Sequence, residues 1–310
     1  MATMQGMTGD NWRRFAALSA VAADVAAGAV KGWQADLVHA HDWQTAMTAA
    51  YVRHGRAPKT PVVLTVHNLA FQGRFDAGIF PDLGLPASAF AVDGVEYYGG
   101  VGFLKAGLQY ADAITTVSPT YADEIRTPAF GMGLDGLLRG RGDAVQGIVN
   151  GIDTTEWDPA TDSHLAAHFS SRSLGPRAAN RRMIEKRFAL KRGKGPIFAI
   201  VSRLTWQKGT DLIVDAIDHI VAHGARLVAL GSGDSAFEGA LMGAATGILH
   251  PTASGDALKA AISRAIALFH APGVWQAIRK QGMKADFGWG RSSARYAALY
   301  RSLVDRSVTR

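Results

Sequence analysis

The sequence predicts an α/β protein with two Rossmann-like domains, each built on an incomplete parallel sheet. Over residues 35–151, short segments rich in β-branched residues alternate with helical segments, as expected of parallel strands joined by crossover helices. The alternation stops over 152–195 and then restarts, so we expect an N-terminal domain at 1–176 and a C-terminal domain at 177–310. A length of 310 residues also suits two domains.

The first domain offers four strand candidates. They are ADLVHAHD at 35–42, PVVLTVH at 61–67, DAITTVS at 112–118 and VQGIVNG at 145–151. Apolar residues follow helical spacing in the segments between and before them, which predicts helices at 12–30, 43–54 and 97–111. Pro119 suits the first turn of a further helix, because its missing N–H is not needed there.

The second domain is short of strands. IFAIVSR at 197–203 and RLVALGSG at 226–233 are clear candidates, and TGILH at 246–250 is a weaker one. Helices are expected at 209–224, 255–270, 272–282 and 290–304. A doubly wound sheet with so few strands keeps an open edge, which favours self-association.

Composition excludes several classes of protein. The chain has no cysteine, so disulfides, thiolate catalysis and cysteine metal sites are excluded. The net charge of +7 favours anionic partners. Nine Lys or Arg lie between Arg172 and Lys194, with Glu185 as the one acid. We interpret this run as a solvated helix and linker, and expect no nucleic-acid partner, because no nucleic-acid-binding fold or interleaved aromatic pattern accompanies it.

A cytoplasmic protein without membrane spans is expected. No apolar run approaches the ~20 residues that a spanning helix needs. Arg13–Arg14 before an alanine-rich stretch resembles the start of a signal peptide, which leaves secretion as an alternative. Asp24 interrupts that stretch and Asp10–Asn11 precede it as a helix cap, so an amphipathic helix is favoured.

Candidate binding residues follow the strands, because ligands of open α/β sheets bind at the carboxyl ends of the strands. In SRLTWQKG (202–209), Arg203 ends a strand and Lys208 precedes a helix, so two cations beside a helix N-terminus suit a diphosphate. A pair of surface cations without a ligand is the alternative. The remaining residues of this polar set are Asp42, Trp43, His67, Asn68, Asn150, Gly231, Ser232, Gly233 and Asp234.

Other kinds of site find less support. The GSGD segment at 231–234 lacks the last glycine of a dinucleotide fingerprint, since Ala236 occupies that position. His39 and His41 share one strand face, but no second cluster of ligands accompanies them, so packed or networked histidines are favoured over a metal. No G-x-S-x-G segment is present for a serine hydrolase.

The motifs, taken in order, resemble those of bacterial glycogen synthases and plant starch synthases. The matching segments are HAHDWQTAM (39–47), TVHNLAFQG (65–73), YYGGVGFLKAGLQYADAITTVSPTYADEI (97–125), GIVNGIDTTEWDPATD (147–162), IVSRLTWQKGTDLI (200–213) and LGSGD (230–234). The resemblance implies two Rossmann-like domains facing across a cleft, the GT-B type, with the final helix 290–304 crossing back to the first domain. It also implies transfer of glucose from ADP-glucose to the non-reducing end of an α-1,4-glucan, with retention and without metal or cofactor.

The resemblance also implies roles for individual residues. Arg203 and Lys208 would hold the diphosphate of the donor and assist its departure. His67 would contact the donor sugar near the reacting carbon, and Asn150 would contact it as well. Asp42 and Trp43 would lie near the sugar and the acceptor. The nucleotide pocket would include Gly231, Ser232, Gly233 and Asp234.

The sequence departs from the family pattern in two main places. It contains no K-x-G-G-L loop, since its first lysine, Lys31, precedes Gly32–Trp33. It also lacks the E-P-C-G-L-x-Q segment, and no glutamate follows Glu238. Losing one charge contact of this kind typically costs ~100- to 1000-fold in rate. A catalytically inactive relative that binds glucan or partner synthase chains is therefore the alternative function.

Overall fold

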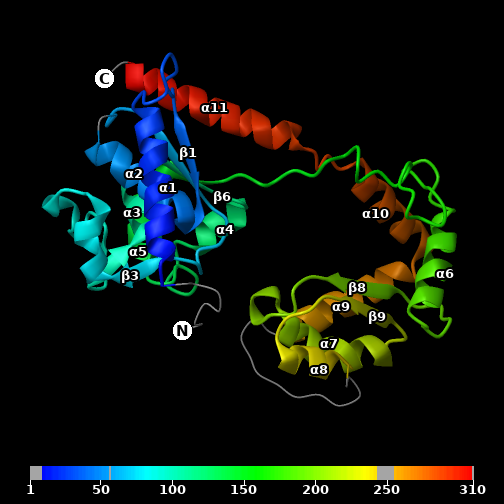
Figure 1. Ribbon diagram of the computed structural model, residues 1–310. Coiled ribbons are helices and arrows are strands. Elements are labelled where there is room, and N and C mark those ends of the chain that lie inside the picture. The colour runs from blue at the N-terminus through cyan, green and yellow to red at the C-terminus, as the bar shows by residue number, and fades with distance from the viewer. Residues whose placement is uncertain (1–8, 56, 243–254, 309–310) are drawn as a thin grey trace. The chain divides into compact units, whose positions relative to one another are not determined.

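The structure, a computed structural model, describes residues 9–55, 57–242 and 255–308. The chain divides into two compact units (Figure 1): unit 1 comprises Met1–Asp153 with Gly288–Arg310, and unit 2 comprises Thr154–Phe287. Within the described ranges, every helix is too short or too polar to traverse a lipid bilayer.

The division between the units falls earlier than the predicted boundary between 176 and 177. Residues 154–176 belong to unit 2, where their backbone is tied to helix α6 (Arg177–Arg187). The Asn180 side chain accepts a hydrogen bond from the N–H of Ala167 at 2.9 Å and donates one to its carbonyl at 2.8 Å. This local pairing explains why the strandless segment does not stay with the first unit.

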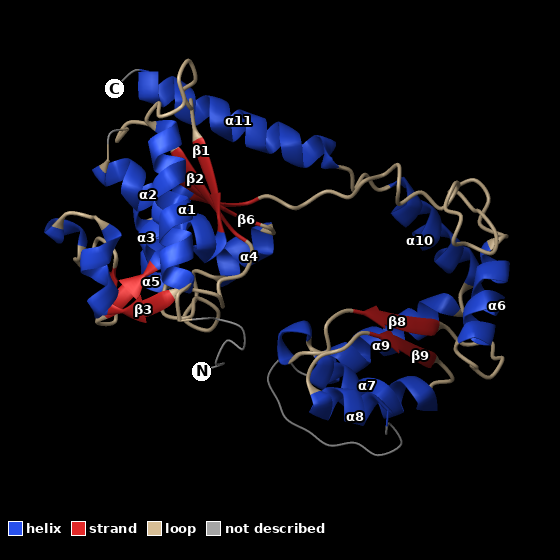
Figure 2. Cartoon of the chain, viewed as in Figure 1, coloured by secondary structure: helices blue, strands red, loops and turns tan. Residues whose placement is uncertain are grey.

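Unit 1 is built on a four-stranded parallel sheet (Figure 2). In spatial order its strands are β1 (Val38–His41), β2 (Val62–Val66), β6 (Ala113–Thr116) and β7 (Val145–Gly147). They lie within the four predicted segments and are shorter than predicted. In the register of the sheet, Val63 of β2 pairs with His39 of β1 and with Ala113 of β6.

The connecting helices cover one face of this sheet, as right-handed crossovers between strands in sequence order require. They are α2 (Asp42–His54), α3 (Phe103–Tyr110), α4 (Pro119–Glu124) and α5 (Asp135–Gly140), and α1 (Asn11–Ala26) packs against α2. The alternation of β2 sends Leu64 and Val66 into this core, where Met47 and Phe103 are fully buried. Burying such side chains supplies ~1.5–3 kcal/mol each.

The opposite face of the sheet is covered by the C-terminal helix, α11 (Trp289–Val308). Leu299 and Leu303 of this helix pack against Val63 and Ala113, the residues of β2 and β6 that point away from the main core. The final helix therefore belongs to unit 1, although it lies within the predicted C-terminal domain at 177–310. The resemblance implied that this helix crosses back to the first domain.

A small antiparallel sheet replaces the start of the helix predicted at 97–111. Its strands, in spatial order, are β3 (Arg74–Asp76), β5 (Gly100–Gly102) and β4 (Glu96–Tyr97). A Cβ at Gly100 would lie 2.4 Å from the carbonyl oxygen of Phe75, so only glycine permits this strand pairing. Short 3-10 helices follow at η1 (Ala77–Leu83), η2 (Ala87–Ala89) and η3 (Gly142–Ala144).

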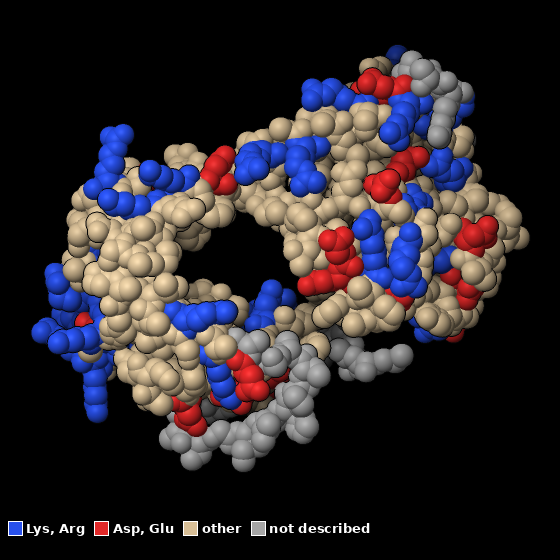
Figure 3. Space-filling view, turned by 180° about the vertical axis from the view of Figure 1, so that it is seen from behind, with Lys and Arg blue, Asp and Glu red and all other residues tan. Residues whose placement is uncertain are grey.

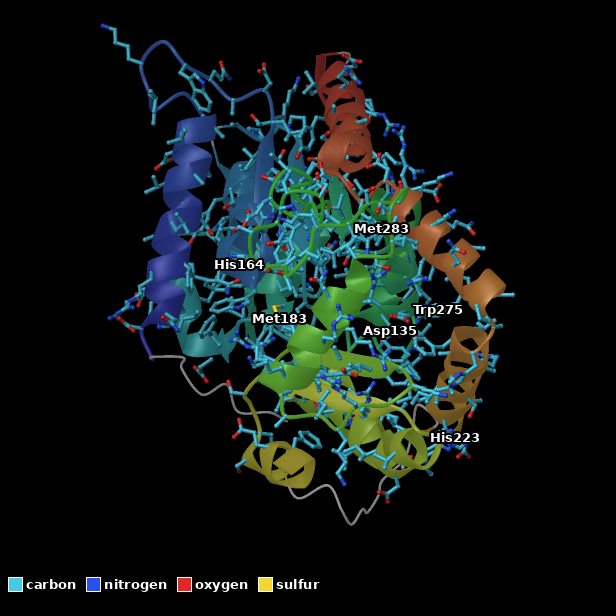
Figure 4. All side chains as sticks on the ribbon, turned by 90° about the vertical axis from the view of Figure 1, so that its right-hand side faces the viewer. Asp135, His164, Met183, His223, Trp275 and Met283 are labelled. Atoms are coloured by element: carbon cyan, nitrogen blue, oxygen red, sulfur yellow. The ribbon has the colours of Figure 1, made fainter. Side chains whose placement is uncertain are left out.

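Unit 2 contains two parallel strands in its described part, β8 (Ile197–Val201) and β9 (Arg226–Leu230). One face of the pair packs on α7 (Thr210–Ala222) and α9 (Gly255–Phe269). The other helices are η4 (Trp206–Lys208), α8 (Ser235–Met242) and α10 (Pro272–Lys284). His223 ends α7 (Figure 4) and bonds through Nδ1 to the carbonyl of His219 at 2.8 Å. The weaker strand candidate at 246–250 lies outside the described residues.

The basic run predicted as a solvated helix is partly structural. Glu185 of α6 is 8% exposed and forms ion pairs with Arg181 at 3.3 Å and Arg226 at 2.6 Å. The Arg226 hydrogen bond is the largest cause that lowers the pKa of the Glu185 carboxyl. Both arginines also donate to the carbonyls of Gly193 and Gly195, so the loop before β8 is held to α6 and to β9. Further Lys and Arg side chains surround the α6 edge of unit 2 (Figure 3).

Candidate functional site

The two loops that leave the carboxyl ends of β8 and β9 run side by side in unit 2. Backbone hydrogen bonds join Leu204 N to the Ser232 carbonyl at 3.0 Å and Asp234 N to the Leu204 carbonyl at 2.8 Å. Leu204 and Gly233 also form an isolated parallel bridge. The two motifs that the sequence analysis singles out, SRLTWQKG and GSGD, therefore share one surface.

Glycine makes this close approach possible. A Cβ at Gly231 would lie 1.8 Å from the carbonyl oxygen of Ser202, and one at Gly233 would lie 2.3 Å from that of Leu204. No side chain larger than hydrogen fits at either position without separating the loops. The resulting surface presents backbone and the exposed Ser232.

Arg203 and Lys208 are exposed on the first of these loops. Neither forms an ion pair or a side-chain hydrogen bond with any residue that the structure describes. Lys208 ends η4, and Gly209 then takes a positive φ of 68° as the N-cap of α7. Thr210 Oγ1 donates to the Thr205 carbonyl at 3.0 Å and fixes this turn. Two cations thus stand before a helix N-terminus, an arrangement suited to an anionic ligand.

In the second loop, 231–234, some of the hydrogen-bonding groups are already engaged by residues of helix α8. The N–H of Gly233 donates to the Glu238 carboxylate at 2.7 Å, and Asp234 Oδ1 accepts from the N–H of Ala236 at 2.9 Å. Together these bonds cap the start of α8. The Gly233 amide and one oxygen of Asp234 are therefore engaged, and the two free cations are the stronger features for binding an anion here.

In unit 1, Asp42 organises the loop after β2. It begins α2 with a positive φ of 53°, a left-handed conformation that is uncommon for non-glycine residues but is more frequent for aspartate. Its Oδ1 accepts hydrogen bonds from the N–H of His67 at 2.7 Å and of Asn68 at 3.4 Å. The carboxylate of one strand end therefore positions the backbone of the next.

Three histidines lie together at these strand ends. His41 Nδ1 is 3.1 Å from His67 Nε2, and the His39 and His41 rings stack with centroids 4.3 Å apart. Burial and the two neighbouring imidazoles lower the pKa of His39 to about 4. Burial, then His67, lowers the pKa of His41, against the opposing effect of Asp42.

Both ring nitrogens of His39 take part in a hydrogen-bond network. Its Nε2 lies 2.6 Å from Thr65 Oγ1 and its Nδ1 lies 2.7 Å from the Tyr300 hydroxyl of α11. Thr65 Oγ1 is in turn 2.6 Å from Thr115 Oγ1, which lies 3.5 Å from the Tyr296 hydroxyl. Sequence reasoning favoured a packed or networked histidine here but did not identify the partners in this network. Its one signal was the presence of threonines at strand positions that are otherwise apolar.

Trp43 does not have the position expected of a substrate contact. Its side chain is 4% exposed and packs edge-on against Phe15 at 4.9 Å between ring centroids, with Phe75 and Phe103 nearby. The close approach of Gly73 covers its ring, since a Cβ there would lie 2.2 Å away. Trp43 is therefore a core residue behind Asp42, and the prediction that it contacts substrate is not supported.

The remaining candidates divide between two places in unit 1. Asn68 is half-buried, and its Oδ1 accepts from the N–H of Ala70 at 3.0 Å, so it shapes the loop after His67. Asn150 is exposed beyond β7, where Ile152 pairs with Gly288 in an isolated parallel bridge. The structure brings Asp42, His67 and Asn68 together in unit 1, and it brings Arg203 beside the 231–234 loop in unit 2.

Comparisons with known proteins agree on one family. The family model of the starch synthase catalytic domain matches residues 3–140. The chain is 46% identical over 375 residues to the glycogen synthase of Mesorhizobium japonicum, covering 96% of this chain and 78% of that protein. It is also 46% identical over 376 residues to the glycogen synthase of Novosphingobium aromaticivorans, covering 95% and 77%.

Two solved structures are also similar to this chain. The catalytic domain of starch synthase IV from Arabidopsis thaliana, bound to ADP and acarbose, superposes with a TM-score of 0.81 at 25% identity, covering 96% of this chain and 78% of that one. Sucrose-phosphate synthase from Thermosynechococcus elongatus has a TM-score of 0.50 at 14% identity, covering 99% and 81%, which is a likeness of fold alone.

The alignments are longer than the chain. The match to the Mesorhizobium protein spans 375 positions, whereas this chain has 310 residues, so at least 65 aligned positions of the relative have no counterpart here. The gap lies inside the matched stretch.

Proposed function

The chain belongs to the glycogen synthase family of glycosyltransferases, and on that premise we propose that it transfers glucose from ADP-glucose to the non-reducing end of an α-1,4-glucan, with retention of the anomeric configuration. The catalytic domain of starch synthase IV was solved bound to ADP and acarbose, and this supports a donor that carries a nucleoside diphosphate. The single observation that carries the proposal is the pair of exposed cations Arg203 and Lys208 beside the 231–234 loop, neither of which has a partner among the described residues.

The proposed chemistry follows from these cations. The bond between C1 of glucose and the terminal phosphate oxygen breaks, and the leaving ADP gains negative charge that Arg203 and Lys208 stabilise. The 4-hydroxyl of the acceptor attacks C1 from the side that ADP leaves, and its proton passes to the departing phosphate. Arg203 presents a fork of donors and Lys208 a compact charge, so the two contact different phosphate oxygens.

Unit 1 residues act on the sugar in this proposal. His67 contacts the glucosyl group near C1, and Asp42 holds the His67 backbone through its 2.7 Å hydrogen bond. Asn150 supplies a further sugar contact. No metal or organic cofactor takes part, because the guanidinium and ammonium groups provide the positive charge that a metal would otherwise supply.

The experiment that tests the proposed function follows the product. The purified chain is incubated with glycogen and ADP-glucose or UDP-glucose labelled in the sugar. We expect label from ADP-glucose at chain ends that an exo-acting α-1,4-glucanase releases. Label from neither donor, with protein that is folded by circular dichroism, would overturn the proposal.

A second function is favoured by the absent aligned positions. At least 65 positions of the relative are missing, and no glutamate follows Glu238, so a chain that binds glucan without transferring glucose is the alternative proposal. Co-sedimentation with glycogen in the absence of turnover would support it. A folded chain that stays in the supernatant while glycogen sediments would exclude it.

A further inference from the structure

The ring of His67 has a defined partner at one nitrogen. His41 Nδ1 lies 3.1 Å from His67 Nε2, and the two ring centroids are 5.4 Å apart with an interplanar angle of 30°. A hydrogen bond between two imidazole nitrogens needs one N–H and one lone pair, so the protonation pattern of one ring decides that of the other. Since Nε2 of His67 is engaged, Nδ1 is its remaining nitrogen for a ligand.

The position of His41 is itself fixed by neighbouring residues. Its ring stacks on that of His39 with an interplanar angle of 29°. Both nitrogens of His39 are fixed, by Thr65 of β2 and by Tyr300 of α11. The backbone of His41 is anchored as well, because its N–H donates to Thr45 Oγ1 at 2.6 Å. A continuous set of contacts thus runs from α11 through two rings to His67.

We propose that His41 is a positioning residue that fixes the tautomer and ring orientation of His67, and so decides whether Nδ1 of His67 donates or accepts. The inference rests on the proposed function, in which His67 contacts the donor sugar. Burial and the neighbouring imidazoles lower the pKa of both His39 and His41, which favours the neutral form of these two stacked rings. The residue acts through His67 and touches no substrate atom.

Three substitutions separate the hydrogen bond from the packing. His41→Phe keeps a flat ring against His39 and removes the nitrogen. His41→Asn places an amide where Nδ1 stands, and His41→Gln places it where Nε2 stands. If the bond through Nδ1 matters, Asn restores function and Gln does not. His54→Phe is the matched control, since His54 also bonds through a ring nitrogen, to Tyr110 at 3.0 Å, outside the site.

The first readout needs no catalysis. Ring ¹⁵N shifts of histidine-labelled full-length chain report tautomers, and the His67 signals are assigned by their loss in His67→Gln. We expect one tautomer of His67 in the wild type, His41→Asn and His54→Phe, and a mixture in His41→Phe and His41→Gln. An unchanged His67 spectrum in His41→Phe would overturn the inference. This holds even if the chain transfers no glucose, so failure of the proposed function is recognised separately.

The second readout is turnover. We expect His41→Phe to lower kcat by about 10- to 100-fold, the usual loss when the orienting partner of a functional histidine is removed, with little change in KM for ADP-glucose. His41→Asn recovers most of this loss and His41→Gln does not. Equal kcat in His41→Phe and His54→Phe, with both folded to the same urea midpoint as the wild type, would contradict the positioning role.

Discussion

Arg203 and Lys208 lack partners in the described part of the chain and lie on the loop beside the 231–234 segment. Other cations of unit 2 are used structurally, as when Arg181 and Arg226 share the buried Glu185. Exposed cations of like sign before a helix N-terminus repel each other and gain from an anion between them. The spacing of the two residues indicated this site, whereas their freedom from other partners required the structure.

Lys208→Ala is expected to weaken ADP binding. A hydrogen bond to a charged group contributes about 1.5–3 kcal/mol, which corresponds to a rise in Kd of about 10- to 100-fold. Titration calorimetry with ADP measures this directly and does not depend on turnover. Lys280→Ala, an exposed cation of α10, is the control and should leave the Kd unchanged. Equal affinity of the two variants would remove Lys208 from the site.

His39 makes the stability of unit 1 depend on pH. Its pKa is 6.5 when unfolded and about 4 when folded, so the unfolded chain binds the proton more readily. The contribution to stability is complete above pH 6.5 and is lost as pH falls from 6.5 to about 4. We expect the urea midpoint to drop more between pH 7.5 and 5 in the wild type than in His39→Gln. Parallel pH dependences of the two proteins would contradict this account.

At the scale of elements, the loops after β8 and β9 show how strand order creates a site. The carboxyl ends of two adjacent parallel strands bring together segments that are about 30 residues apart, and alternating glycines let them run in contact. The sequence indicated each motif separately. The backbone hydrogen bonds that join them follow from the pairing of β8 with β9, and the Glu238 cap depends on the reach of that side chain. No spacing rule specifies either feature.

Gly233→Ala is expected to destabilise unit 2. The added Cβ would meet the Leu204 carbonyl at 2.3 Å, and relieving such a contact typically costs about 1–3 kcal/mol. Gly282→Ala in α10 is a matched control, because nothing lies within 4 Å of its Cβ and alanine favours the helix by about 0.5–1 kcal/mol. Urea denaturation should therefore move in opposite directions for the two variants. A Gly233→Ala midpoint at or above that of the wild type would be inconsistent with the tight loop pairing.

Across the whole molecule, the predicted fold class is confirmed by its likeness to GT-B glycosyltransferases. Strands were predictable because β-branched runs alternate with helical spacing. The early boundary of unit 2 was not predictable, because it depends on tertiary hydrogen bonds of Asn180. The late start of α3 was not predictable either, because the glycines before Phe103 form a strand. The burial of Trp43 was also not predictable, because the segment 39–47 contains both the polar end of β1 and an aromatic ring of the core.

Association between copies of the chain through the short sheet of unit 2 remains a prediction. Val201 and Leu230 pair across β8 and β9 and are 75% and 60% exposed, so an apolar sheet surface faces solvent. We expect sedimentation equilibrium to show a mass that rises with concentration, and Val201→Glu to reduce that rise. Val221→Glu, on the exposed side of α7, serves as the control. A monomeric mass at every concentration would contradict the prediction.

We propose that the residues present suffice for transfer despite the missing aligned positions. The most direct measurement compares incorporation of labelled glucose from ADP-glucose into glycogen by the wild type and by a chain with both Arg203→Ala and Lys208→Ala. We expect the wild type to incorporate labelled glucose into glycogen and the double variant to lose this activity, with both proteins folded. Incorporation that survives the double variant would contradict the assigned site, and no incorporation by the folded wild type would contradict transferase activity itself.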